Sequence, residues 1–166
     1  MTTCKERISD RYEGRIKDLR LLYDMDVCYG LDKCELEALV DTIDVTFGYT
    51  PEPDFDAILE CLYNARAEYG LCWDYVEPDT FNEHAEIPEG YYRYQLSCGG
   101  PQDEFRFYPG YMNTRKGWHL SKITYNFLDW FDGAEMTRQG DDWKMLETIY
   151  QDFVDCGMCE THKEDI

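Results

Sequence analysis

The sequence has no stretch approaching the ~20 consecutive apolar residues that cross a bilayer, which argues against a membrane-spanning helix. It also lacks the charged start and apolar centre of a secretory signal peptide. The first seven residues are polar and lead directly into a helical pattern. We therefore expect a cytoplasmic protein, in the host cell cytoplasm if a phage encodes it.

Motifs of familiar enzyme classes are also absent. There is no Gly-rich phosphate loop, Walker lysine or H-E-x-x-H. The three histidines are dispersed and have no Ser or Cys nucleophile motif near them: His84, His119 and His162. Asp129 and Asp132 are the best carboxylate pair for a hydrolase, although a strand end followed by a turn explains them as well. We expect no enzyme and name no catalytic residue.

Basic residues are few, with 16 Lys and Arg against 35 Asp and Glu, for a net charge of −19. The acid is segregated. Residues 21–90 carry −16 and residues 127–166 carry −8, whereas 1–20 and 91–126 carry +2 and +3. Such a field repels nucleic acid and anionic membranes and attracts basic surfaces. The competing interpretation is a solubilising coat or an adaptation to high salt.

Apolar residues, by contrast, are plentiful. A hydrophobic share of 43% and an aromatic share of 16% exclude a disordered chain. The 166 residues fit one domain, spanning 1–166 with a frayed tail at 158–166. Without a signal peptide, the eight cysteines are expected to be reduced thiols.

Four helices are predicted from caps and apolar periodicity. Thr3 and Glu6 form a capping-box pattern before a helix at 4–24, and Asp32 and Glu35 form another before a helix at 33–47 that Gly48 ends. A third helix opens at Thr50-Pro51 and Pro53 and ends at Gly70. Asp141 is expected to cap the last helix, which Gly157 ends.

Strands are predicted where the pattern alternates and β-formers gather. These segments are 71–77, 91–98, 104–108 and 119–130, with Asp132-Gly133 ending the last. The fold class is therefore α+β, an antiparallel sheet of about four strands with helices packed on it, in the order α-α-α-β-β-β-β-α.

Two acidic rows stand out on the second and third predicted helices. Their members recur about every four residues, which places carboxylates ~6 Å apart along a helix: Glu37, Asp41 and Asp44, then Glu52, Asp56 and Glu60. Such a row can imitate DNA phosphates and dock where a nuclease or repressor keeps its Lys and Arg. The same spacing also arises on any solvated helix face.

One metal site is a hypothesis. Cys156, Cys159 and His162 have a spacing that can reach one Zn²⁺ from a helix end, although a fourth ligand is missing nearby. The alternative is a frayed tail with incidental cysteines. We expect no other cofactor.

Residues 90–108, GYYRYQLSCGGPQDEFRFY, followed by residues 128–134, LDWFDGA, resemble a pattern of small uncharacterised acidic proteins from phages, plasmids and other mobile elements. In charge and size the chain also resembles antirestriction and anti-CRISPR proteins. These resemblances imply an anti-defence protein whose partner is a basic nucleic-acid-binding protein, with no direct contact to nucleic acid. The alternative is a non-catalytic protein-interaction adaptor, zinc-stabilised or plain, with an acidic solubilising surface.

Overall fold

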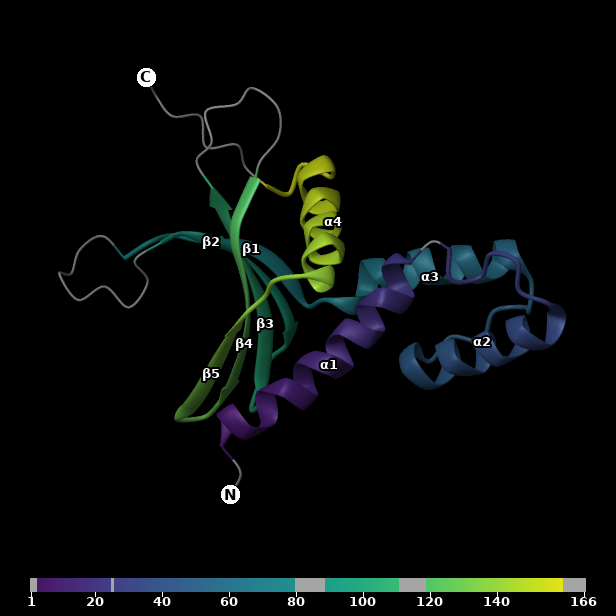
Figure 1. The fold of residues 1–166 in the computed structure, drawn as a ribbon, viewed down its shortest axis with the longest axis horizontal. Helices are drawn as coiled ribbons and strands as arrows, with labels where there is room; N and C mark the ends of the chain where they lie inside the picture. The colour runs from purple at the N-terminus through teal and green to yellow at the C-terminus, as the bar shows by residue number, and fades with distance from the viewer. Residues whose placement is uncertain (1–2, 25, 80–88, 111–118, 160–166) are drawn as a thin grey trace. The chain divides into compact units, whose positions relative to one another are not determined.

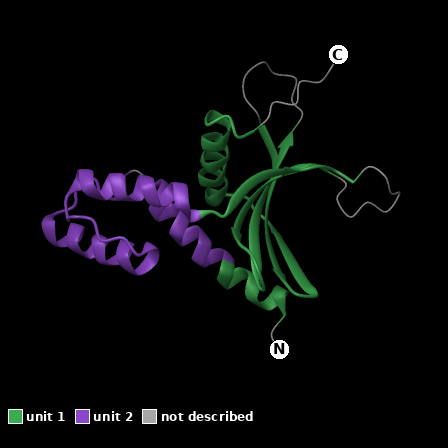
Figure 2. Ribbon diagram, turned by 180° about the vertical axis from the view of Figure 1, so that it is seen from behind, with its two compact units in different colours: residues 1–11, 70–166 green, residues 12–69 purple. Residues whose placement is uncertain are grey.

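The computed structural model describes residues 3–24, 26–79, 89–110 and 119–159. Its elements are α1 (Cys4–Tyr23), α2 (Lys33–Phe47), α3 (Phe55–Tyr69), β1 (Cys72–Val76), β2 (Tyr91–Ser97), β3 (Gln102–Gly110), β4 (His119–Asp129), β5 (Asp132–Thr137) and α4 (Asp141–Asp155) (Figure 1). They divide into two compact units (Figure 2). Unit 1 comprises residues 1–11 and 70–166, and unit 2 comprises residues 12–69. Helix α1 therefore contributes its start to unit 1 and the rest to unit 2.

Unit 1 is built on one sheet in which sequential strands are neighbours, in the order β1-β2-β3-β4-β5, with every pair antiparallel. This confirms the predicted α+β class, but the described residues form five strands where about four were expected. The extra strand is β5, because Asp129 pairs with Asp132 and the chain turns back through Trp130 and Phe131. The predicted strand at 119–130 agrees with β4 to within one residue, whereas the prediction that Asp132-Gly133 ends it was wrong, because both residues belong to β5.

One face of the sheet is aromatic and packs against α4. Trp73 of β1 stacks on Phe153 of α4 with ring centroids 3.9 Å apart, and on Tyr92 of β2 at 5.7 Å. Tyr150 of α4 stacks on Phe107 of β3 at 5.7 Å. Aromatic side chains bury ~150–250 Å² each, so this layer supplies much of the apolar burial of unit 1.

The start of α4 differs from expectation. Gly140, with a positive φ of 82°, occupies the N-cap position and makes no side-chain cap bond. Asp141 is instead the first helical residue, and its carboxylate favours the helix through the N-terminal dipole.

Unit 2 has its own apolar core between helices. Val40 and Ile43 of α2 pack with Ile58, Leu62 and Ala65 of α3, and this cluster also contains Leu22 and Cys28. The capping boxes at Thr3–Glu6 and Asp32–Glu35 and the left-handed stop at Gly48 are as predicted. Across the described part of the chain, no helix is both long enough and apolar enough to cross a membrane.

Candidate partner-binding surface

The predicted acidic row on α2 lies on its solvent side. Glu37, Asp41 and Asp44 are all exposed and follow one another at i, i+4 and i+7. They occupy one flank of the helix, beside the core stripe of Val40 and Ile43. The row is therefore accessible to a partner along about two turns of helix.

Part of this row is engaged at its two ends. Lys33 Nζ lies 3.9 Å from Glu37 Oε1, and Thr50 Oγ1 donates to Asp44 Oδ1 at 3.0 Å. Both contacts are between exposed side chains, where ion pairs and hydrogen bonds contribute little. Asp41 has no hydrogen bond or ion pair within the part of the chain that the structure describes.

The second row is shorter than predicted. Asp56 and Glu60 are exposed on α3, but Glu52 precedes the helix, which begins at Phe55. Pro53 explains the difference, because a residue before proline is disfavoured in the helical region. The cap is Asp54, whose Oδ1 accepts from the backbone amides of Asp56 and Ala57 at 3.1 and 3.2 Å. Glu52 is exposed, but it does not extend the periodic row.

The one basic residue of α3 does not offset this acid. Arg66 donates from Nη2 to the Leu22 carbonyl at 2.9 Å, and its guanidinium lies over the Tyr23 ring at 4.1 Å. Its charge is thus directed toward α1 within unit 2. The exposed side of α3 that carries Asp56 and Glu60 keeps its negative charge.

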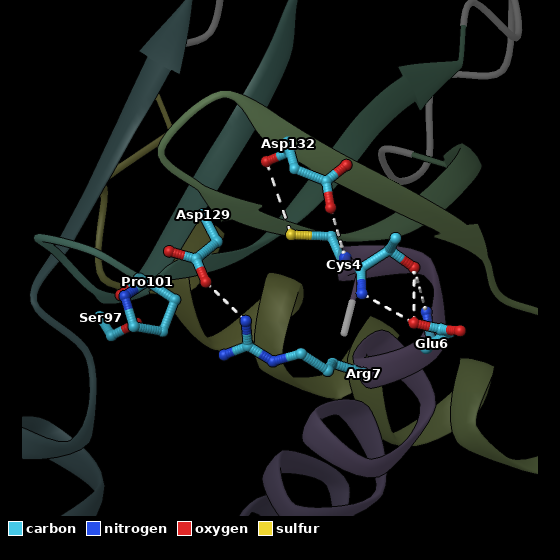
Figure 3. A network of polar contacts seen from close by, with 8 residues as sticks. Cys4, Glu6, Arg7, Ser97, Pro101, Asp129 and Asp132 are labelled. Carbon is cyan, nitrogen blue, oxygen red and sulfur yellow. Dashed lines mark hydrogen bonds and ion pairs between the residues drawn. The ribbon is translucent and has the colours of Figure 1, made fainter. Parts of the chain in front are cut away.

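Asp129 and Asp132, the carboxylates considered for hydrolysis, both bind the start of α1 (Figure 3). Arg7 Nη1 lies 2.5 Å from Asp129 Oδ2, and the Cys4 amide donates to Asp132 Oδ2 at 2.6 Å. The hydrogen bond from the Cys4 backbone amide lowers the pKa of Asp132, which keeps that carboxylate ionised. These contacts give both residues a role in attaching the N-terminal segment to the β4–β5 hairpin.

The predicted metal ligands are only partly described. Cys156 is exposed after α4, Cys159 is partly buried, and His162 lies outside the described residues. Burial raises the pKa of Cys159 to about 11, so this thiol is protonated at neutral pH when no metal is bound. Among the residues with described positions, no group of three or more Cys, His, Asp or Glu is arranged to hold a metal ion. The zinc site stays a prediction.

The sheet face opposite α4 carries ion pairs of arginine with carboxylates. Arg93 bonds Asp74 at 2.9 and 2.6 Å across β2 and β1, and Arg106 lies 2.7 Å from Glu104 along β3. Glu104 is only 2% exposed. Alternation along β3 could have placed Glu104 and Arg106 on one face, but their burial depends on the neighbouring strands. These arginines are neutralised locally and do not form a basic patch.

No protein-family model, curated protein or solved structure matches this chain.

Proposed function

We propose that the chain is an anti-defence protein that mimics DNA and occupies the basic nucleic-acid-binding groove of a host nuclease complex. The observation that carries the proposal is the set of exposed carboxylates on α2 and α3: Glu37, Asp41, Asp44, Asp56 and Glu60. Residues 24–68 contain twelve acidic residues and two basic ones.

The number of negative charges in this segment is comparable to the number of phosphate charges on a stretch of DNA of similar length. Helix α2 has 15 residues and is therefore ~22 Å long. B-DNA of that length carries ~13 phosphate charges, because it has one charge per ~1.7 Å of axis. Twelve acids on α2, α3 and their connections approach that number. A groove lined with Lys and Arg would form ion pairs with either partner, and binding either one would release counterions into solution.

The rows also carry a cost that a role in folding does not explain. Glu37 and Asp41, and likewise Asp56 and Glu60, are like charges four residues apart, each pair disfavouring its helix by ~0.2–0.5 kcal/mol. Other acids of unit 2 have local roles: Asp32 and Asp54 cap helices, and Glu68 accepts from Tyr49. Asp41 and Glu60 have no such bond in the described chain. Exposed, unpaired and mutually repelling carboxylates favour recognition of a basic partner.

The test reverses these two charges. Asp41→Lys with Glu60→Lys replaces two repulsive pairs by attractive ones, so the free energy of unfolding should rise by about 0.8–2 kcal/mol. Binding to nuclease subunits captured from host lysate should nevertheless weaken by roughly 10-fold to 150-fold. The slope of log Kd against log salt should fall by about two, since two contacts that release counterions are lost.

The matched control is Glu135→Lys with Asp155→Lys, which changes the net charge equally on exposed positions of β5 and α4. It should leave binding and its salt dependence nearly unchanged. Duplex DNA should compete with the wild-type chain for the same partner, and the chain itself should not bind DNA. Equal loss of binding in both double variants, or binding that high salt leaves intact, would show that the acid only solubilises the protein.

A further inference from the structure

We propose that Trp130 and Phe131, the tip of the β4–β5 hairpin, form an anchor that inserts into an apolar pocket of a basic protein partner. Trp130 is 85% exposed and Phe131 is fully exposed, at 103%. The other large apolar side chains exposed in the described chain have no such sequence neighbour: Tyr29, Val45, Tyr63, Leu71 and Met158. Two adjacent aromatic rings in water at the end of a hairpin are costly to keep unless something covers them.

The local sequence does not favour a turn at these positions. Trp130 has a φ of +56°, in the left-handed region that bulky residues rarely adopt. Two-residue hairpin turns with a positive φ favour Gly, Asn or Asp there, and Asp-Gly is among the strongest signals. Asp132-Gly133 offers that signal, yet both residues lie in β5. The chain thus turns two residues earlier, at a cost in backbone conformation, and places two aromatic residues at the tip.

The tip is held in place from both sides. Asp129, before it, pairs with Arg7, and Asp132, after it, accepts the Cys4 amide while its carbonyl lies 3.5 Å from Cys4 Sγ (Figure 3). The indole also lies against the β2–β3 turn, because a Cβ placed on Gly100 would be 2.8 Å from the indole nitrogen. A rigid anchor loses little conformational entropy when it binds.

The charge of the chain favours one occupant. The tip alone offers about 300–500 Å², less than the about 1,200–2,000 Å² of a stable protein interface, so any protein that binds it must also contact the surface around it. A second copy would bring two net charges of −19 together. The same charge opposes an anionic lipid surface. A basic protein is attracted instead, and a Trp that fills a pocket is the usual form of an interface hot spot.

The carboxylates beside the tip do not prevent an apolar pocket from closing over it. Asp129 is neutralised by Arg7, and Asp132 is bonded at the start of α1. A DNA mimic and an adaptor could each use such a contact, so this inference does not depend on the proposed function.

A first experiment asks whether the aromatic tip serves the fold. Trp130→Asn with Phe131→Gly gives the turn the residues that a left-handed conformation favours. The midpoint of thermal unfolding should shift by less than about 4 °C in either direction. A fall of more than about 8 °C would show that the rings hold the hairpin together, and would overturn the anchor.

A second experiment traps the partner. Full-length protein with p-benzoylphenylalanine at Phe131 is irradiated in lysate of the cells in which the gene is expressed, with the same label at exposed Leu71 as control. We expect an adduct with one basic protein from position 131 only. Unlabelled wild-type chain should compete for it at least about 10-fold better than the Trp130→Asn, Phe131→Gly variant.

Four results would overturn the anchor. These are the absence of an adduct, identical adducts from both labelled positions, adducts only between copies of this chain, or equal competition by the tip variant. Loss of the Phe131 adduct on adding phosphatidylcholine and phosphatidylglycerol vesicles, with cosedimentation of the chain, would assign the tip to a lipid surface instead.

Discussion

Two buried tyrosines of unit 1 should respond differently to the same substitution. Tyr125 of β4 and Tyr150 of α4 are 0% and 1% exposed. The Tyr125 hydroxyl donates to Asp103 Oδ2 at 2.6 Å. The Tyr150 hydroxyl has no hydrogen-bond partner among the described residues. Replacing each by Phe removes one oxygen and leaves the ring in place.

The expected magnitudes follow from what each hydroxyl contacts. Tyr125→Phe removes a hydrogen-bond donor from Asp103, which is 1% exposed. The free energy of unfolding should therefore fall by about 1.5–3 kcal/mol. Tyr150→Phe removes an oxygen that folding has taken out of water without compensation. That change should leave stability unaltered or raise it by up to about 2 kcal/mol. In thermal unfolding, Tyr125→Phe should lower the midpoint by about 3–12 °C, and Tyr150→Phe should not lower it.

The assay is urea unfolding followed by tryptophan fluorescence, with equal slopes of free energy against urea required for the comparison. A cycle that combines Tyr125→Phe with Asp103→Asn should give a coupling energy of about 0.5–3 kcal/mol. Equal losses in both single variants, or a larger loss for Tyr150→Phe, would refute the assignment of these hydroxyls. It would mean that Tyr150 donates to a partner outside the described residues.

The cysteines after α4 give the remaining predictions. Since burial raises the pKa of Cys159 from 9.0 to about 11, iodoacetamide at pH 8 should alkylate it ~100-fold more slowly than an unshifted thiol, which mass spectrometry of the labelled peptide will measure. The stability linked to this shift is present below pH 9 and lost as the pH rises toward 11, so a Cys159→Ser variant should lose less stability over that interval. If Cys156, Cys159 and His162 bind zinc, purified protein should contain about one equivalent and Cys159→Ser should lose it; elemental analysis that finds no metal in protein never exposed to chelator refutes the site.

The helices were largely predictable because their signals are local. Helix α2 begins at the capping box of Asp32 and Glu35 and ends at Gly48, and each of these residues acts within about one turn of its own position. Glu52 lies outside α3 although its spacing from Asp56 is helical, because the proline that follows it disfavours helical backbone at this position. The exposure of Asp41 and Glu60 followed from periodicity alone, whereas their lack of partners required the positions of Lys33 and Arg66.

The β4–β5 hairpin was not predictable from local signals. Asp132-Gly133 is a good turn, and Gly133, Ala134 and Glu135 are poor strand formers. Pairing with β4 and the contacts of Cys4 and Arg7 determine the register, and Cys4 and Arg7 lie more than a hundred residues before the hairpin in the chain. Trp130 therefore resembled the end of a strand in the sequence, although it forms the tip of a turn.

The bond between Arg7 and Asp129 joins residues 122 positions apart, and this separation affects the order of events on the ribosome. At ~5–20 residues per second, the hairpin is synthesised roughly 6–24 s after the segment that it binds. Residues 12–69, with their own helical core, are complete well before then. Unit 2 is thus expected to fold first. The first eleven residues can pack only after the last strands have been synthesised and the sheet has formed.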